Sequence, residues 1–191
     1  MNVTVCVPTY KRPHLLILLL QDILKQRLKP DGIIIVDGDP DSNEVCRLLS
    51  DLCANSLLIY VPSNHGNLPY QRYLGWRVAA DLQADVLIYF DDDERLPAND
   101  VLTRLIAPFE RHDDVVGVGC VIRFGETLDG SDASIMRRSY RSSVLAQMLG
   151  SARNVPLGHL TPTGHRKLPK DTHSEYVETQ WLRGGVMAYR M

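Results

Sequence analysis

Short apolar runs alternate with amphipathic stretches along the first half of the chain. Four runs rich in β-branched and aliphatic residues predict strands: Val3–Val7, Gly32–Val36, Leu57–Val61 and Val86–Phe90. The stretches that follow them space their apolar residues as helices do: Leu15–Leu28, Val45–Cys53, Pro69–Leu82 and Val101–Arg111. Strands separated by helices of this length form parallel sheets through right-handed crossovers. The pattern therefore predicts an α/β fold with a mostly parallel, Rossmann-like sheet and helices on both faces.

Turn residues set the expected limits of these elements. Pro8 is expected to end the first strand, Ser42 to cap the second helix, and Pro69 to begin the third. Val115–Arg123 predicts a further strand, and Trp181–Met191 a turn that leads into a last one. Between these two strands the periodicity weakens and turn residues become frequent. Long loops in compact domains tend to be functional or mobile.

Composition narrows the class of protein. With 191 residues, 45% hydrophobic and 23% charged, the chain is typical of a soluble globular domain. A net charge of −2 gives no electrostatic basis for nucleic-acid binding. The longest apolar run, Leu15–Leu20, is too short to cross a bilayer, so membrane contact is at most peripheral. Four cysteines without a CxxC pair indicate free thiols and a cytoplasmic location.

The most informative feature is an acidic run, Asp91–Glu94, directly after the strand Val86–Phe90. Four adjacent like charges repel, and the usual remedies are a divalent cation, exposure to solvent, or protonation of one member. The carboxyl ends of strands in open α/β sheets are also where ligands bind. A hard cation such as Mg²⁺ or Mn²⁺ that carries a substrate phosphate fits this position. The alternative is a solvated acidic turn that caps the next helix.

Three other strand ends carry polar side chains. Thr9 follows the first strand, where Arg12 offers a charge for phosphate; the alternative is a plain strand-to-helix turn. Asp37 ends the second strand and can accept hydrogen bonds from a nucleobase or ribose; the alternative is a helix-capping acid. Arg72 lies near a helix N-terminus, where a cation needs an anion beside it, either a phosphate or a salt-bridge partner. Together with the acidic run, these residues are expected along one sheet edge.

The order of these motifs resembles family 2 glycosyltransferases of the GT-A fold. The resemblance rests on Val-Pro-Thr-Tyr-Lys-Arg-Pro, Val-Asp-Gly, Asn-His-Gly-Asn followed by Gln-Arg-Tyr-Leu-Gly, Phe-Asp-Asp-Asp-Glu-Arg-Leu-Pro as the DXD motif, and Trp-Leu-Arg-Gly-Gly-Val-Met-Ala-Tyr-Arg. It covers residues 3–112 and 181–190. It implies one GT-A-like domain over residues 1–191, with a nucleotide-sugar-binding half (1–123) and a variable, acceptor-side and incomplete half (124–191).

The resemblance also implies roles for single residues. The donor would be a nucleotide-diphosphate sugar, with Mg²⁺ or Mn²⁺ bridging its phosphates. By position, Thr9 and Asp37 would hold the base and Arg72 the base or the phosphates. Asp91 would hold the ribose, Asp93 would ligate the metal, and Asp92 could share either task. Gly184 and Gly185 would line the acceptor side, although a plain turn before a strand explains them too.

The implied reaction is transfer of a sugar, with inversion, from a UDP-sugar (or, second, a dTDP- or GDP-sugar) to a glycan or other hydroxyl acceptor. A bacterial polysaccharide is the expected product. Such a displacement needs a carboxylate base, which the family carries beyond the Gly-Gly element, and no motif supports Asp171, Glu175 or Glu178 in this role. One alternative is a truncated nucleotide-sugar-binding module without activity. Another is a nucleotidyltransferase, disfavoured because the turn after the first strand lacks a Gly-rich phosphate loop.

Overall fold

The computed structural model describes residues 1–52, 57–120 and 185–191. The chain separates into two compact units, residues 1–120 with 183–191, and residues 121–182, which lie outside the described part. The first unit contains, in order, β1 (Val3–Thr9), α1 (Pro13–Leu24), β2 (Gly32–Asp37), the 3₁₀ turn η1 (Pro40–Ser42), α2 (Glu44–Leu52), β3 (Leu58–Pro62), α3 (Leu68–Asp81), β4 (Val86–Phe90), α4 (Val101–Arg111), β5 (Gly117–Gly119) and β6 (Val186–Arg190).

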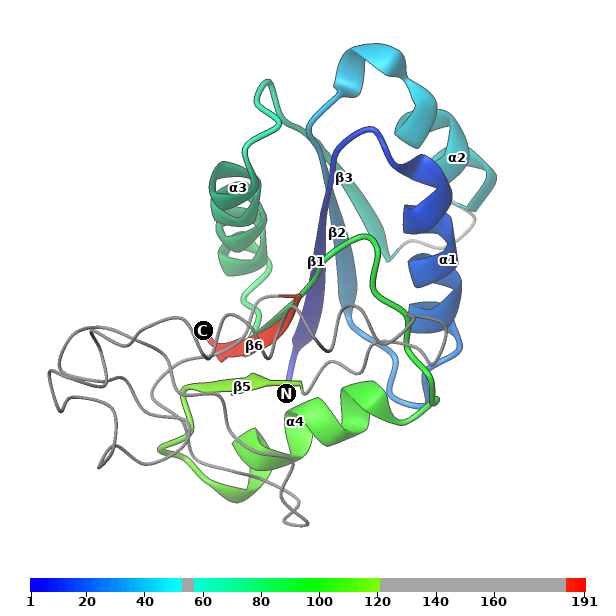
Figure 1. Ribbon diagram of the computed structural model, residues 1–191. Helices are drawn as coiled ribbons and strands as arrows, with labels where there is room; N and C mark the ends of the chain where they lie inside the picture. The colour runs from blue at the N-terminus through cyan, green and yellow to red at the C-terminus, as the bar shows by residue number, and fades with distance from the viewer. Residues whose placement is uncertain (53–56, 121–184) are drawn as a thin grey trace, which may run out of the picture. The chain divides into compact units, whose positions relative to one another are not determined.

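The strands form one six-stranded sheet in the order β3-β2-β1-β4-β6-β5. β1 to β4 are parallel, whereas β6 runs antiparallel to both β4 and β5. Figure 1 shows β6, from the end of the chain, beside strands of its first half. The predicted α/β fold with a mostly parallel sheet is confirmed, because the first four strands run parallel and a helix connects each of them to the next along the chain.

Helices cover both faces of the sheet, as predicted. Figure 1 shows α1 and α2 on one side and α3 on the other. The larger apolar core lies under α1, α2 and α4 and includes Leu16, Leu49, Phe90 and Phe109. A smaller core lies under α3 and is built around Cys6, Ile34 and Leu87. Both faces of the central strands are thus removed from water, which explains why β1, β2 and β4 are apolar without alternation.

Among the element limits that differ from the sequence prediction, three have a clear physical reason. β1 continues through Pro8, which pairs with Val36 of β2. The β1–β4 ladder reaches only to Cys6, so Pro8 lies where β1 has a neighbour on one side, and such a position tolerates a missing N–H. α1 ends at Leu24, although Leu28 still packs against the core from the connection that follows. That packing explains why the apolar spacing extended the predicted helix too far.

The start of α2 is the third difference. Ser42 belongs to the 3₁₀ turn, where its hydroxyl donates to the carbonyl of Asp39 at 2.9 Å. Asn43 follows in the left-handed conformation, with a φ of 55°, and α2 begins only at Glu44. Asn43 tolerates this conformation better than most residues. Ser42 thus lies one residue before the expected cap position, although its hydroxyl oxygen still accepts from the N–H of Glu44, the first residue of α2, at 3.4 Å.

A small-residue face lets α3 approach the sheet closely. Gln71, Gly75 and Ala79, spaced four apart, are its buried residues. A Cβ atom built on Gly75 would collide with the Sγ atom of Cys6 on β1. This position therefore requires glycine for close packing rather than for an unusual backbone conformation. The close approach brings the first turns of α3 to the carboxyl ends of β1 and β2.

Candidate functional site

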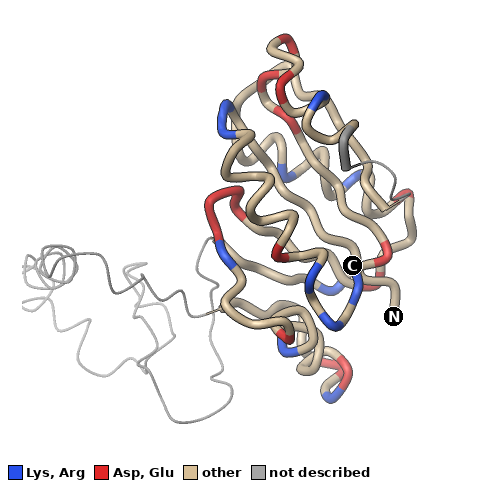
Figure 2. Tube along the Cα trace, turned by 90° about the vertical axis from the view of Figure 1, so that its right-hand side faces the viewer, with Lys and Arg blue, Asp and Glu red and all other residues tan. Residues whose placement is uncertain are grey.

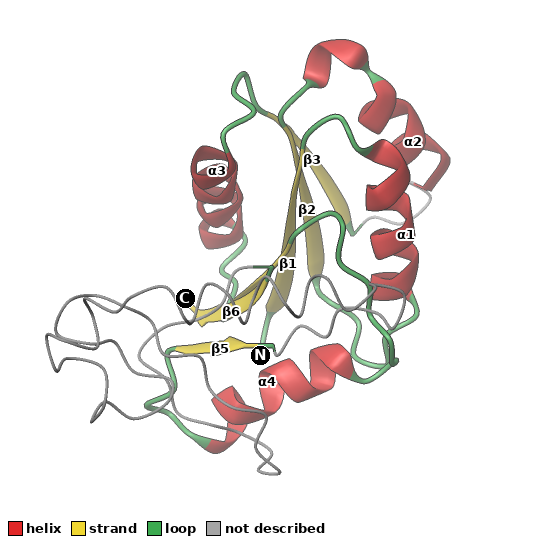
Figure 3. Ribbon diagram, viewed as in Figure 1, coloured by secondary structure: helices red, strands yellow, loops and turns green. Residues whose placement is uncertain are grey.

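The carboxyl ends of the parallel strands place the predicted polar residues at one edge of the sheet. Thr9 and Asp37 are register partners at the ends of β1 and β2. Asp91 directly follows β4, which pairs with β1 on its other side. Figure 3 shows the loops after β1, β2 and β3 leaving the sheet at this edge. The spatial grouping expected from sequence is thus present, and contacts among the side chains decide what each can do.

Asp92 is the buried member of the acidic run. It is 1% exposed, and its Oδ2 atom accepts a hydrogen bond of 2.8 Å from the hydroxyl of Thr9. Burial raises the pKa of Asp92 above its usual value, while the Thr9 hydrogen bond and the charge of Arg12 oppose the rise. Thr9 is itself buried. This pair therefore ties β1 to the segment after β4.

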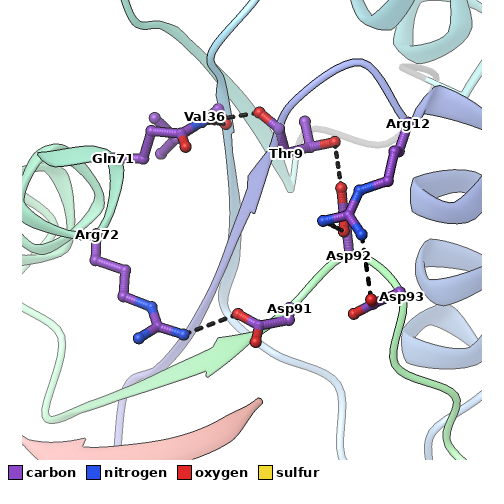
Figure 4. A network of polar contacts seen from close by, with 8 residues as sticks. All are labelled: Thr9, Arg12, Val36, Gln71, Arg72, Asp91, Asp92 and Asp93. Atoms are coloured by element: carbon purple, nitrogen blue, oxygen red, sulfur yellow. Dashed lines mark hydrogen bonds and ion pairs between the residues drawn. The ribbon is translucent and has the colours of Figure 1, made fainter. Parts of the chain in front are cut away.

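Arg12 places a cation on the acidic run. Its Nη2 atom lies 2.7 Å from Asp92 Oδ1, and its Nη1 atom lies 3.1 Å from Asp93 Oδ2. Figure 4 shows the guanidinium lying against both carboxylates. Asp93 is the outer member, with a side chain 52% exposed. Figure 2 shows the acidic run as an unbroken red stretch followed directly by a blue one. Arg12, which is distant in the sequence, thus offsets the repulsion between these adjacent carboxylates.

Arg72 forms an ion pair with Asp91, at 2.8 Å between Nη2 and Oδ1. Its guanidinium carbon lies 5.8 Å from the ring centre of Tyr89, whose hydroxyl donates to the carbonyl of Arg72 at 2.8 Å. Arg72 is the fifth residue of α3, just beyond the first turn. The anion that this arginine needs is therefore supplied, in the structure, by a carboxylate of the same chain.

Asp37 is fully buried and internally bonded. Its Oδ1 atom accepts from the backbone N–H of Asp39 at 2.9 Å, and its Oδ2 atom accepts from the hydroxyl of Tyr60 at 3.0 Å. Burial, with the hydrogen bond to Asp37, raises the pKa of Tyr60 above its usual value. Asp37 therefore lies at the strand end, as expected from the sequence. Its carboxylate holds the turn after β2 through the backbone N–H of Asp39.

Sequence reasoning missed Gln71. This residue is 2% exposed, and its amide nitrogen donates to the carbonyls of Thr9 at 2.8 Å and of Val36 at 3.0 Å. Figure 4 shows its side chain reaching from α3 to these two strand ends. It therefore pins the helix to the edge of the sheet. The sequence contained a signal for it. Gln71 lies on the same helical face as the small residues Gly75 and Ala79, and a face of small residues indicates close packing that buries the Gln71 amide.

The segment after the acidic run is fastened to α1. Asp22 accepts two hydrogen bonds from Arg95, at 2.6 Å from Nε and 3.1 Å from Nη2. Gln26, also buried, donates to the carbonyl of Ala98 at 2.7 Å and accepts from the N–H of Leu102 at 3.3 Å. Two polar residues four apart within the predicted apolar helix Leu15–Leu28 were the available signal. The carboxylates thus lie on a segment held at both of its ends.

Two cavities open at this edge. The first has a volume of about 440 Å³ and is lined by Pro8, Thr9, Tyr10, Arg12, Gly66, Leu68, Gln71, Asp91, Asp92 and Asp93. The second has a volume of about 330 Å³ and is lined by Tyr10, Gly38, Asp39, Pro40, Asp41, Ser63, Asn64 and Gly66. Tyr10 and Gly66 belong to both. A Cβ atom on Gly66 would lie 2.7 Å from the Tyr10 ring, so glycine is needed for this contact.

Gly185 lies beside the acidic run. It precedes β6, has a φ of 102°, and its carbonyl accepts from the N–H of Asp91 at 2.9 Å. A φ in this range favours glycine. Gly184 lies outside the described residues, as do the acids Asp171, Glu175 and Glu178. The element thus reaches the site through Gly185, whose role toward an acceptor stays a prediction.

The donor set suits a metal that takes most of its ligands from a substrate. Among the described residues no cluster of three or more His, Cys, Asp or Glu side chains could hold an ion. Mg²⁺ in phosphate-transfer sites characteristically binds one or two carboxylates together with substrate phosphates. Asp93 offers one half-exposed carboxylate at the wall of the first cavity. The residues present therefore fit a hard cation that arrives with a diphosphate.

None of the helices in the described ranges is both long and apolar enough to cross a bilayer.

Comparison with known proteins gives the chain its family. Residues 4–167 match the description of Glycosyl transferase family 2. An O-antigen chain rhamnosyltransferase, RfbN, from Salmonella typhimurium is 31% identical over 134 residues, which are 70% of this chain and 40% of that protein. The fold also resembles solved structures, two of which follow.

The first is the mannosyltransferase PcManGT from Pyrobaculum calidifontis, in complex with GDP-Man and Mn²⁺. It has a TM-score of 0.59 and 18% identity over 99% of this chain and 44% of that one. The second is TarS 1-349 of S. aureus with UDP-GlcNAc, with a TM-score of 0.57 and 17% identity over 68% of this chain and 36% of that one. The chain thus spans less than half the length of these relatives. On its sequence match it belongs to glycosyl transferase family 2.

Proposed function

We propose that this chain binds a nucleotide-diphosphate sugar and a divalent metal at the described sheet edge, as the donor-binding part of a glycosyltransferase. The observation that carries the proposal is the first cavity, which Thr9, Arg12 and the carboxylates of Asp91, Asp92 and Asp93 line together. A diphosphate needs cations and a metal needs carboxylates, and this cavity presents both. Family membership makes the sugar, rather than a phosphoryl group, the transferred part.

Within this proposal each carboxylate has a different task. Asp93, half-exposed, would hold Mg²⁺ or Mn²⁺, which as a Lewis acid stabilises the departing diphosphate. Asp91, part-exposed and oriented by Arg72, would accept hydrogen bonds from the ribose hydroxyls. Asp92 is buried and bonded to Thr9, so it would support the other two and reach the ligand least.

The nucleobase would lie in the second cavity, against Tyr10 and the turn that follows β2. Asp37 holds this turn through the N–H of Asp39, and a direct contact between Asp37 and the base stays a prediction. Thr9 lines the first cavity beside this region. Arg72 would act on the base or phosphates only if it left Asp91, so we propose orientation of Asp91 as its first role.

The donor is proposed to be a UDP-sugar, with GDP- and dTDP-sugars as the next candidates. The structural neighbours bind GDP-Man and UDP-GlcNAc, so the fold accommodates either class of base. The acceptor is proposed to be a hydroxyl group of a growing polysaccharide, in line with the O-antigen role in the name of RfbN. Gly184 and Gly185 would border the acceptor, transfer would invert the anomeric carbon, and the protein would act in the cytoplasm.

Isothermal calorimetry with UDP, with and without Mn²⁺, tests the donor site. We expect metal-dependent binding that Asp93→Ala abolishes. Asp113→Ala is the matched control, because it removes an exposed carboxylate from the turn after α4. If UDP, GDP and dTDP all fail to bind, or if Asp93→Ala binds UDP as the wild type does, the proposed site is wrong.

A second experiment separates an enzyme from a binding module. Sugar release and transfer are measured with UDP-, GDP- and dTDP-sugars, each at equal concentration with Mn²⁺ and a panel of glycan acceptors. Turnover with one donor class supports a transferase. Metal-dependent binding without turnover supports the alternative, a nucleotide-sugar-binding module that lacks the base.

A further inference from the structure

A cation of the chain itself already occupies the carboxylates proposed for the metal. Arg12 contacts Asp92 Oδ1 at 2.7 Å and Asp93 Oδ2 at 3.1 Å with two different nitrogens. Its side chain is 46% exposed and lines the first cavity. A guanidinium and a metal ion on the same Asp93 carboxylate would repel each other. Arg12 and the metal therefore compete for one position.

A diphosphate offers Arg12 a second partner in the same cavity. The planar guanidinium pairs equally well with two carboxylate oxygens or two phosphate oxygens, because both fit its fork of donors. When a metal binds Asp93, Arg12 loses this negatively charged partner, and a bound diphosphate can replace it. Movement of Arg12 by one side-chain length would thus exchange one anion for another.

We propose that Arg12 is an exchange residue, which neutralises Asp92 and Asp93 while no donor is bound and transfers to the donor diphosphate when the metal occupies Asp93. This inference rests on the proposed function. It makes Arg12 a phosphate-binding residue whose affinity for the donor is coupled to the metal.

The surroundings of Arg12 fit such a movement. It leads from the β1–α1 connection into α1, at the N-cap position, and follows Lys11, whose φ is 57°. When Arg12 leaves, the Oδ2 atom of Asp92 keeps its hydrogen bond from Thr9, and only the Oδ1 atom loses its ion-pair partner. Arg72 is a contrasting case, because its side chain is only 24% exposed and is also held over the Tyr89 ring.

Exchange predicts a specific pattern of coupling between ligands. A metal alone must displace Arg12 without compensation and should bind weakly. A metal together with a diphosphate should bind cooperatively, because the diphosphate receives the displaced guanidinium. Linkage requires the reciprocal effect, in which the metal strengthens diphosphate binding by the same factor.

The test measures the dissociation constant of Mn²⁺ alone, from the electron paramagnetic resonance signal of free Mn²⁺, and that of UDP by calorimetry. Arg12→Gln should bind Mn²⁺ alone about fivefold more tightly than the wild type, because the competitor is gone. In the same variant, the factor by which Mn²⁺ increases the affinity for UDP should be about tenfold smaller than in the wild type. Arg12→Lys, which keeps the charge but not the fork, should give intermediate values. Uridine, which has no phosphate, should bind all variants equally.

Arg104→Gln is the matched control, since Arg104 of α4 forms an ion pair with Asp100, the residue before that helix. It should reproduce the wild type in every titration. Unchanged or weaker binding of Mn²⁺ alone to Arg12→Gln would overturn the exchange, as would full coupling between Mn²⁺ and UDP in that variant. Failure of the proposed function would look different, because wild-type protein itself would then show no metal-dependent UDP binding.

Discussion

The hydroxyl of Thr9 and the carboxylate of Asp92 meet at 2.8 Å, although 83 positions separate them along the chain. The contact joins the end of β1 to the segment after β4, and both residues line the first cavity. Both residues are buried. One hydrogen bond therefore links the two parts of the sequence that carry the proposed base-side and metal-side residues.

Thr9→Val should lower the free energy of unfolding by about 1–3 kcal/mol, because a buried carboxylate loses a donor while the side-chain volume hardly changes. Thr9→Ser keeps the hydroxyl and should lose less. Urea denaturation at neutral pH, followed by circular dichroism, measures the difference. Equal losses in the two variants would show that the methyl group, and not the hydrogen bond, is what matters at this position.

Gly75→Ala should destabilise the protein by about 1–3 kcal/mol, because the added methyl group meets Cys6 Sγ and α3 must move away from the sheet. Cys6→Ala removes that sulfur atom and should cost less by itself. The double variant should then be more stable than the sum of the two losses predicts, by at least about 0.5 kcal/mol. A strictly additive double-mutant cycle in urea would exclude this contact as the cause.

Asp22 gives the stability a defined pH dependence. The hydrogen bond from Arg95 lowers the pKa of Asp22, and the N–H of Leu96 and the charge of Arg95 act in the same direction. A carboxyl whose folded-state pKa is depressed contributes stability above its unfolded pKa of about 3.9, and the contribution is lost as the pH falls through the folded-state pKa. The effect is moderated by solvent, since the Arg95 side chain is 58% exposed.

Asp22→Asn should therefore cost about 1–2 kcal/mol at pH 7, and the difference from the wild type should shrink as the pH falls below about 4. Urea titrations at a series of pH values measure it. Arg104→Gln, which breaks the ion pair between Arg104 of α4 and Asp100 at the N-cap of that helix, should cost no more than about 0.5 kcal/mol and serves as control. A loss for Asp22→Asn that stays constant with pH would contradict the role of its charge.

Local pattern was enough to predict the elements but not the pairing of charges. The apolar run before Asp91 fixed β4 because a buried strand has few alternatives, and α4 begins and ends as its spacing indicated. The prediction that Pro8 ends β1 was wrong, because a proline interrupts a strand only where its N–H is needed. Whether it is needed depends on how many strands flank β1 at Pro8, which is a property of the whole sheet. The same limitation applies to the acidic run. Which arginine faces which carboxylate depends on register across some eighty residues for Arg12, and on the tilt of α3 for Arg72.

Asp92→Asn should stabilise the protein at neutral pH. Burial raises the pKa of Asp92, so the folded state favours the protonated form, and stability present below the unfolded pKa is lost as the pH rises through the folded-state pKa. Asparagine cannot ionise, still accepts from Thr9, and removes repulsion with Asp91 and Asp93. We expect a gain of about 1 kcal/mol at pH 7.5 that disappears near pH 4, measured by urea denaturation. A loss at pH 7.5 would mean that the ion pair with Arg12 outweighs the cost of burying the charge.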